Sequence, residues 1–122
     1  MRLMDIISRV DELKPNSISS EAKTEWVTEL ANMIRREVIL PITGILSDVV
    51  YDYLENPEMN IEISQGYEDI YIHYLSAKID YYNAEYGRYN NSKAMFDSAY
   101  DEYKRFMRRT IKPKQKNSFK AV

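Results

Sequence analysis

Residues 79–91 have the sequence IDYYNAEYGRYNN, in which four of the thirteen positions are tyrosine. The chain holds eleven tyrosines, and nine of them fall between Tyr67 and Tyr103. A tyrosine ring offers a large apolar contact area, while its hydroxyl stays hydrogen-bonded when the ring is wet. So many half-polar rings in one segment suit a surface that is buried only part of the time.

Apolar residues in and before this stretch recur at steps of three and four, which predicts a helix over residues 67–89. They form two rows, offset by two residues and therefore facing nearly opposite ways. The first row contains Ile72, Leu75, Ile79, Tyr82, Tyr86 and Tyr89. The second row contains Ile70, Tyr74, Ala77, Tyr81 and Ala84. An ordinary surface helix has one apolar stripe and one polar face.

Two interpretations account for a helix with two apolar faces. In one, the helix is central and its own chain covers both sides. In the other, one face packs at home and the second row, from Ile70 to Ala84, contacts a neighbouring subunit. The tyrosines favour the interface, because aromatic residues are enriched at the centres of interfaces. Under this hypothesis Tyr81→Asp should impair assembly more than folding. Tyr82→Asp should impair folding more than assembly, or impair both.

The remaining sequence predicts an all-α fold, a small bundle of about four helices in one domain over residues 1–110. The helices are expected at about 3–14, 20–40, 67–89 and 92–109, where apolar stripes are bounded by capping or breaking residues. Pro41 and Gly44 should end the second helix. Residues 41–66 should form a long, partly extended loop, because NIEIS alternates like a strand while prolines and glycines interrupt the segment.

Composition sets limits on the class of protein. A chain of 122 residues is enough for one domain. The absence of cysteine excludes disulfides and thiolate chemistry and fits a reducing compartment. No apolar run approaches the length of about 20 residues that a membrane span needs. The N-terminus does not look like a cleaved signal. We therefore expect a soluble protein that does not contact a membrane.

The charge is distributed unevenly along the chain. The net charge is −2, yet no acidic residue follows Glu102, and the eight lysines and arginines beyond it leave −10 for the rest. Residues 111–122 are too polar to form a core and are expected to be an extended basic arm. Such an arm can dock on an acidic protein surface or on nucleic acid, or it can serve as a solvated tail.

Residues with catalytic or metal-binding chemistry form no recognisable motif. His73 is the only histidine, and Asp69 four residues earlier is a single carboxylate, so the pair does not make a metal site. No glycine-rich phosphate loop and no nucleophile motif is present. We expect no cofactor, no metal and no enzymatic activity. Only Phe119 interleaves the lysines of the arm, so the stacking pattern of single-strand binders is missing.

A longer pattern surrounds the opening stretch. Residues 66–113 have the sequence GYEDIYIHYLSAKIDYYNAEYGRYNNSKAMFDSAYDEYKRFMRRTIKP. The tyrosine-rich helix, the YNN turn and the AMF-xx-AY helix resemble phage head–tail connector proteins. These are also called adaptor or head-completion proteins, and they occur in siphophages and prophages of Gram-positive bacteria. The opening MDIISRVDELKPN and the tryptophan-bearing helix after it are similar to the family as well. The ending Phe106-Met107-Arg108-Arg109-Thr110 departs from the family's aromatic-Asn-Arg-Thr form.

The resemblance implies a structural virion protein, assembled in the host cytoplasm and located at the head–tail interface. Family members form a ring beneath the portal, usually dodecameric, that extends the DNA channel and receives the next connector (stopper) or the tail. Packaged DNA would pass without sequence-specific binding. The resemblance places the subunit contacts on the helices between Tyr67 and Arg109. It assigns the portal-binding arm to the segment from Thr110 to Val122, with Lys112, Lys114, Lys116, Phe119 and Lys120 as candidate contacts.

The main alternative is a small DNA-binding or packaging accessory protein that uses the basic tail for phosphate contacts. A third hypothesis, an enzyme acting through surface carboxylates, has no motif in its favour.

Overall fold

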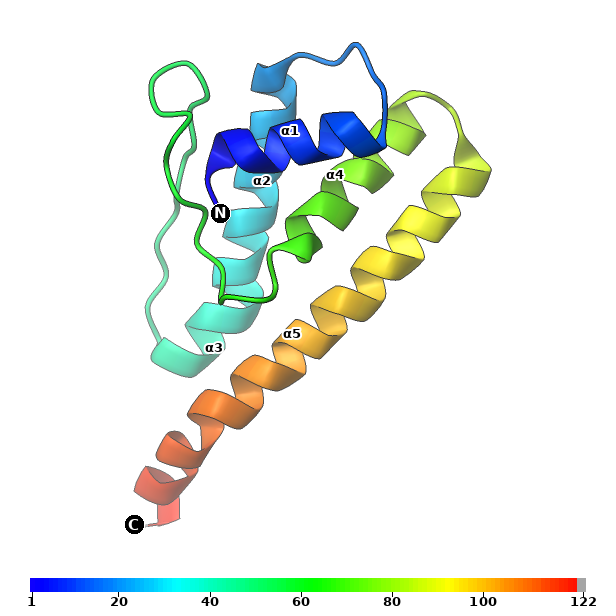
Figure 1. The fold of residues 1–122 in the computed structure, drawn as a ribbon. Coiled ribbons are helices and arrows are strands. Elements are labelled where there is room, and N and C mark those ends of the chain that lie inside the picture. Colours follow the sequence, from blue (N-terminus) through cyan, green and yellow to red (C-terminus); the bar gives the residue numbers. More distant parts are fainter. Residues whose placement is uncertain (121–122) are drawn as a thin grey trace.

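A computed structural model describes residues 1–120, and it describes side chains for residues 1–110. The described chain is all-α, as the sequence predicts (Figure 1). The elements in order are α1 (Leu3–Leu13), α2 (Ser20–Ile34), the π-helical segment η1 (Arg35–Ile39), α3 (Leu40–Thr43), α4 (Asp69–Tyr82) and α5 (Tyr86–Lys120). Within this part of the chain the only β pairing outside helices is an isolated bridge between Arg2 and Asn60.

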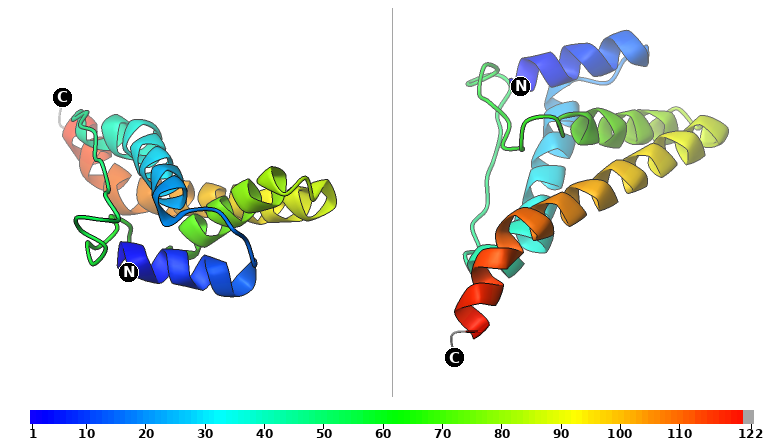
Figure 2. Two further views of the ribbon diagram at one scale, coloured as in Figure 1. Left: turned by 90° about the horizontal axis from the view of Figure 1, so that it is seen from above. Right: turned by 60° about the horizontal axis from the view of Figure 1, so that its bottom comes forward.

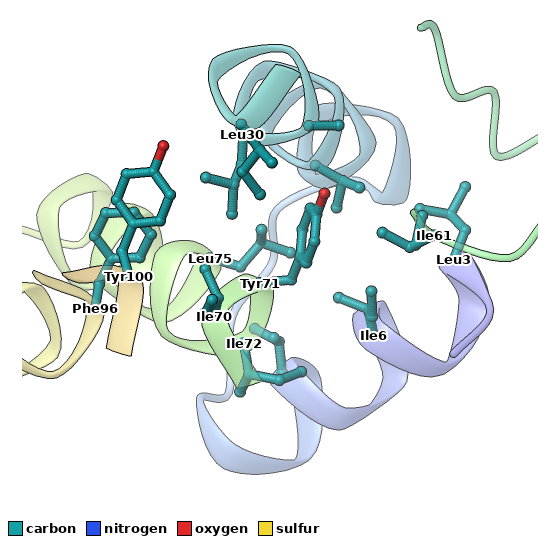
Figure 3. Packing of buried hydrophobic residues seen from close by; sticks show 14 of the residues in the cluster. Leu3, Ile6, Leu30, Ile61, Ile70, Tyr71, Ile72, Leu75, Phe96 and Tyr100 are labelled. Atoms are coloured by element: carbon teal, nitrogen blue, oxygen red, sulfur yellow. The ribbon is translucent and has the colours of Figure 1, made fainter. Parts of the chain in front are cut away.

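Helix α4 is the centre of the molecule. It contacts α1 and α2 on one side and runs beside α5 on the other (Figures 1 and 2). Tyr71 is fully buried between these layers, with Leu30 of α2 and Ile6 of α1 nearby (Figure 3). In its first turn, where Ile70, Tyr71 and Ile72 are buried, α4 is therefore covered by its own chain. Of the two interpretations, the central-helix one holds for this part.

The second helix continues past the predicted end at about residue 40. α2, η1 and α3 are continuous from residue 20 to 43, and Pro41 lies inside this run. The widened turn explains why. In η1 the Leu40 N–H bonds the Arg35 carbonyl, five residues back, just before the proline that cannot donate a hydrogen bond. Gly44 then ends α3 in the left-handed conformation, with φ of +73°.

The loop between α3 and α4 is extended, as predicted, and packs closely against the body. Its carbonyls at Pro57 and Met59 accept the N–H groups of Met4 and Leu3, so the loop satisfies free donors at the start of α1. Tyr51 and Ile61 place their side chains in the core. Because it closes one end of the core, the loop is part of the domain.

Polar side chains along one face of α2 and η1 also hold the loop, through hydrogen bonds. The Asn32 amide both donates to the Val49 carbonyl and accepts from the Val49 N–H, at 3.0 and 2.9 Å. The Thr28 hydroxyl accepts from the Tyr51 N–H, and Arg35 donates to Glu62 and to Ser47. Three side chains spaced by one helical turn thus act as the partner of an extended strand.

The tyrosine segment differs from the prediction of one helix over 67–89 and a turn at Asn90. α4 ends at Tyr82, residues 83–85 form the turn, and α5 already begins at Tyr86. Ala84 takes a left-handed conformation with φ of +58°, and the Glu85 N–H bonds the Asp80 carbonyl. Tyr86 and Tyr89 therefore lie on α5 and are not in the α4 row with Ile79.

The C-terminal segment also differs from the prediction. The expected extended arm from residue 111 is helical through Lys120 as a continuation of α5, which does not end at Pro113. Lysine, the commonest residue of this segment, is a good helix former. Adding residues to an existing helix is also much easier than nucleating a new one.

Candidate functional site

A groove lies between α4 and α5 near the turn that joins them. Its volume is about 420 Å³. Its lining consists of Tyr74, Ala77, Lys78 and Tyr81 from α4, and Tyr89, Lys93 and Phe96 from α5. A groove of this size with an apolar floor and a few polar groups is typical of binding sites. We call it the aromatic groove.

The rings of the groove contact one another across the two helices. The Tyr81 ring lies edge-on to the rings of Tyr86 and Tyr89, at centroid distances of 5.8 and 5.3 Å. Deeper along the groove, Tyr74 and Phe96 are 5.1 Å apart. Tilted and edge-to-face pairs at these distances are favourable. The helices are therefore held together by aromatic pairs that still present ring faces to solvent.

Two lysines lie along the groove, each in an ion pair with a carboxylate. The Lys78 ammonium lies 5.3 Å from the centre of the Tyr74 ring and 3.1 Å from Glu29 of α2. Lys93 pairs with Asp97 one turn along α5, at 3.1 Å. Both ion pairs are exposed, and such pairs are weak because water screens them. The two lysines can therefore exchange these partners for other carboxylates.

A hydrogen bond from Tyr74 to the Glu29 carboxylate ties the groove to α2. Burial and this bond raise the pKa of Tyr74, because a buried phenol that donates to a carboxylate resists ionisation. Burial pushes the pKa of Glu29 upward, but the bonds from Tyr74 and Lys78 outweigh it and the pKa is lowered. Glu29 is thus charged and Tyr74 neutral over the physiological range.

A buried ion pair fixes the end of α4 beside the groove. The Asp80 carboxylate is buried, accepts from the Lys14 ammonium at 3.0 Å and accepts from the Ser92 hydroxyl at 2.7 Å. These three residues join the end of α1, the end of α4 and the second turn of α5. The network sets where α5 starts and therefore how wide the groove opens.

The five residues predicted for a subunit interface lie in different surroundings. Ile70 is buried in the core and has no exposed surface to offer. Tyr74 and Ala77 line the aromatic groove, and Tyr81 lines it while 60% exposed. Ala84 is exposed in the turn. Tyr82, placed in the core-facing row by the sequence, is instead 70% exposed, so the predicted folding defect of Tyr82→Asp is not expected.

The residues predicted for the portal-binding arm belong to the last turns of α5, and the structure does not describe their side chains. They are Lys112, Lys114, Lys116, Phe119 and Lys120.

The sequence did not identify the α5 half of the groove. The predicted helix over 67–89 wrongly includes Tyr89, and nothing in the sequence places the predicted helix over 92–109, which holds Lys93 and Phe96, beside it. The available signal was Asn83, a residue type that tolerates helix C-termini, three residues before Tyr86. Ala84 gave no such signal, because alanine rarely adopts positive φ.

A second apolar surface lies on the opposite side of the molecule from the α4–α5 turn (Figures 1 and 2). It belongs to the loop after α3, whose backbone α2 holds. Its exposed apolar side chains are Ile45, Leu46, Val50 and Leu54, the last two exposed by 79% and 76%. Residues 45–58 also contain four carboxylates and no basic residue. We call this segment the acidic loop.

Comparison of the chain with protein-family models, with curated proteins and with solved structures finds no match. The resemblance to connector proteins therefore remains a prediction from the sequence motifs. Among the described side chains, no three His, Asp or Glu residues are grouped so that they could hold a metal ion. No helix in the searched part of the chain is both long and apolar enough to span a bilayer.

Proposed function

We propose that this chain is a structural subunit of a phage head–tail connector ring. The observation that carries the proposal is the pair of different exposed surfaces, the aromatic groove and the acidic loop, on opposite sides of one small domain. A closed ring is built from one heterologous contact repeated, so each subunit needs two different faces. The resemblance of residues 66–113 to connector proteins points to the same assembly.

In this proposal the helical domain forms the ring wall and has no enzymatic role. The basic end of α5 binds the portal protein, and the face away from the portal receives the next connector or the tail. Repetition of one weak arm contact around the ring would give high avidity. The location would be the virion, at the head–tail interface, after assembly in the host cytoplasm.

Removal of Lys112 to Val122 tests the portal contact. The shortened chain should keep its helical content and unfolding transition, because the described core ends at Met107. It should no longer co-sediment with portal-bearing capsids. A shortened chain that joins these capsids as the full chain does would overturn the role of the arm.

The second candidate is a DNA-binding accessory protein. Its support is the run of eight basic residues after Glu102, all on the continuous helix α5. A helix of this kind can make phosphate contacts whose strength falls steeply with salt. Titration of the full chain with duplex DNA at low salt separates the two candidates. Salt-sensitive binding by the free chain would favour the accessory role, and a flat titration would dismiss it.

A further inference from the structure

The aromatic groove and the acidic loop have complementary chemistry. The groove offers ring faces and the two lysines Lys78 and Lys93. The acidic loop offers exposed aliphatic side chains between carboxylates. Its carboxylates are Asp48, Asp52, Glu55 and Glu58.

Further acidic residues flank the loop. Glu21 and Glu25 of α2 line a hollow of about 330 Å³ beside Val50 and Asp52. The loop surface is thus negative along its length, although Glu58 has Arg2 at 3.8 Å and Asp52 accepts the N–H groups of Leu54 and Glu55. Two loop surfaces would repel each other. The groove lysines already have Glu29 and Asp97 as partners, but these exposed ion pairs are weak, so the carboxylates of a docked loop can take their place.

The acidic loop is also held in one conformation. Thr28 and Asn32 bind its backbone at Tyr51 and Val49 through side chains of α2. Val50 lies between these two anchors and points outward, 79% exposed. A segment already fixed loses little conformational entropy when it binds, so its apolar side chains can contribute fully to a contact.

We propose that the acidic loop of one copy of this chain docks in the aromatic groove of a second copy. Val50 or Leu54 packs on the rings of Tyr81 and Tyr89, and the loop carboxylates pair with Lys78 and Lys93. The contact is heterologous, so a pair of docked copies keeps a free groove at one end and a free loop at the other. This deepens the proposed function, and it rests on that proposal only for the closure of the chain of copies into a ring.

Cysteine cross-linking tests the contact directly, because the chain has no cysteine of its own. Leu54→Cys and Tyr81→Cys are made as separate proteins, mixed at equal amounts and treated with a short bis-maleimide. Val50→Cys serves as a second loop position. The mixture should give a cross-linked dimer containing one of each variant, at least about tenfold more than either variant gives alone, when the chains are near millimolar concentration.

Met95→Cys is the matched control. Met95 is 55% exposed, close to the 60% of Tyr81, but it lines a different hollow with His73 and Glu102. Mixed with Leu54→Cys, it should give only background cross-linking. Equal yields from Met95→Cys and Tyr81→Cys, or no mixed dimer from either loop position, would overturn the proposal.

Two blocking variants test the direction of the contact. Leu54→Asp blocks the loop and Tyr81→Asp blocks the groove, and both sites are exposed, so the circular dichroism of each variant should match that of the parent. By sedimentation the parent should form species beyond the dimer, and each variant alone should stay monomeric. Their equal mixture should form dimers and stop there, because one intact groove meets one intact loop.

A different pattern would identify another occupant of the groove. Dimers from Leu54→Asp alone would mean that groove packs on groove. Oligomers from both single variants would mean that neither surface is used. Failure here is distinguishable from failure of the connector proposal. Capsids that still bind Tyr81→Asp normally overturn this contact alone, whereas loop-to-groove oligomers that never bind portal overturn the connector role alone.

Discussion

Two buried polar residues of α4 differ in how their polar atoms are satisfied. Asp80 has the Lys14 ammonium and the Ser92 hydroxyl within 3.0 Å. The Tyr71 hydroxyl is buried and has no hydrogen-bond partner among the side chains that the structure describes. Unpaired buried polar groups cost stability and paired ones do not. Substitutions at the two sites should therefore have opposite effects.

Lys14→Met should lower the free energy of unfolding by about 2–3 kcal/mol, because it leaves the buried Asp80 carboxylate without its counter-charge. Methionine keeps most of the apolar length of the lysine side chain, so little packing is lost. Urea denaturation followed by circular dichroism measures the change.

Arg105→Met is the matched control, since it breaks an exposed pair with Asp101 on α5. This variant should change the free energy of unfolding by no more than about 0.5 kcal/mol. Equal effects at Lys14 and Arg105 would mean that Asp80 gains nothing from its ammonium partner.

Tyr71→Phe should raise the free energy of unfolding by about 1 kcal/mol, because it removes a buried hydroxyl that has no partner and keeps the ring in place. Urea denaturation at neutral pH measures this change. A loss of stability instead would show that the hydroxyl is bonded to a buried water.

The same residue makes stability depend on alkaline pH. Burial raises the pKa of Tyr71, so above about pH 10 the unfolded chain loses this proton while the folded chain keeps it. Unfolding then releases a proton, and stability falls as pH rises. Below about pH 10 Tyr71 keeps its proton in both the folded and the unfolded chain, so its titration takes nothing from the free energy of unfolding. The advantage of Tyr71→Phe over the parent should therefore grow between pH 10 and 11, and a constant difference would contradict the buried state of the phenol.

At the scale of elements, the turn between α4 and α5 decides how the tyrosines are used. Asn83 ends α4, and Ala84 crosses into the left-handed region before Tyr86 starts α5. The turn is fixed from outside, by the bond of the Glu85 N–H to the Asp80 carbonyl and by Ser92 on the Asp80 carboxylate. These contacts therefore hold Ala84 in a left-handed turn conformation, although alanine itself prefers a right-handed helix.

Ala84→Gly should stabilise the protein by about 1 kcal/mol, because glycine adopts positive φ without the steric cost that alanine bears. No atom lies in the way of this change, since it only removes a methyl group. Thermal unfolding would show a higher midpoint. Ala94→Gly, at an exposed position inside α5, is the control and should cost about 1 kcal/mol. Destabilisation at both positions would argue that residue 84 is helical.

The sequence predicts the elements well where apolar spacing and caps agree. The sequence predicts α1 from an apolar stripe that ends before Pro15. It predicts the helix from Ser20 to about Leu40 from a second stripe, which begins after the capping Ser19. It does not predict structure that other elements impose. Pro41 is carried through by the π-helical turn of η1, and Ala84 is held by Asp80.

The candidate site shows the same limit. Tyr74, Ala77 and Tyr81 follow from helical spacing, and all three line the groove. Helical spacing does not place Phe96 in the groove, because its position opposite Tyr74 depends on where the chain turns from α4 into α5. Spacing also places Ile70 in the predicted interface row, because it gives only a direction around the helix. It does not show that the rest of the chain covers Ile70 in that direction.

At the scale of the whole molecule, charge is separated along the chain. The basic run after Glu102 lies on the last part of α5, which Figure 2 shows on the same side as the loop after α3 and away from the α4–α5 turn. The groove contributes Lys78 and Lys93, each in an exposed ion pair, so the negative field of an approaching acidic loop acts on lysines whose partners it can replace. The field acts over roughly a Debye length, about 10 Å at 0.1 M salt.

The proposed contact between copies should therefore weaken with salt and stay partly intact at high salt. Between 0.1 and 1 M salt the Debye length falls from about 10 to 3 Å, so the lysine–carboxylate part is screened while the aromatic part is not. Sedimentation of the parent should show fewer oligomers at 1 M. The double variant Asp48→Asn/Glu55→Gln should associate more weakly at 0.1 M and respond less to added salt. Met95→Gln should behave as the parent does. Association that strengthens with salt in the parent would mean that apolar packing acts alone and that the carboxylates face solvent.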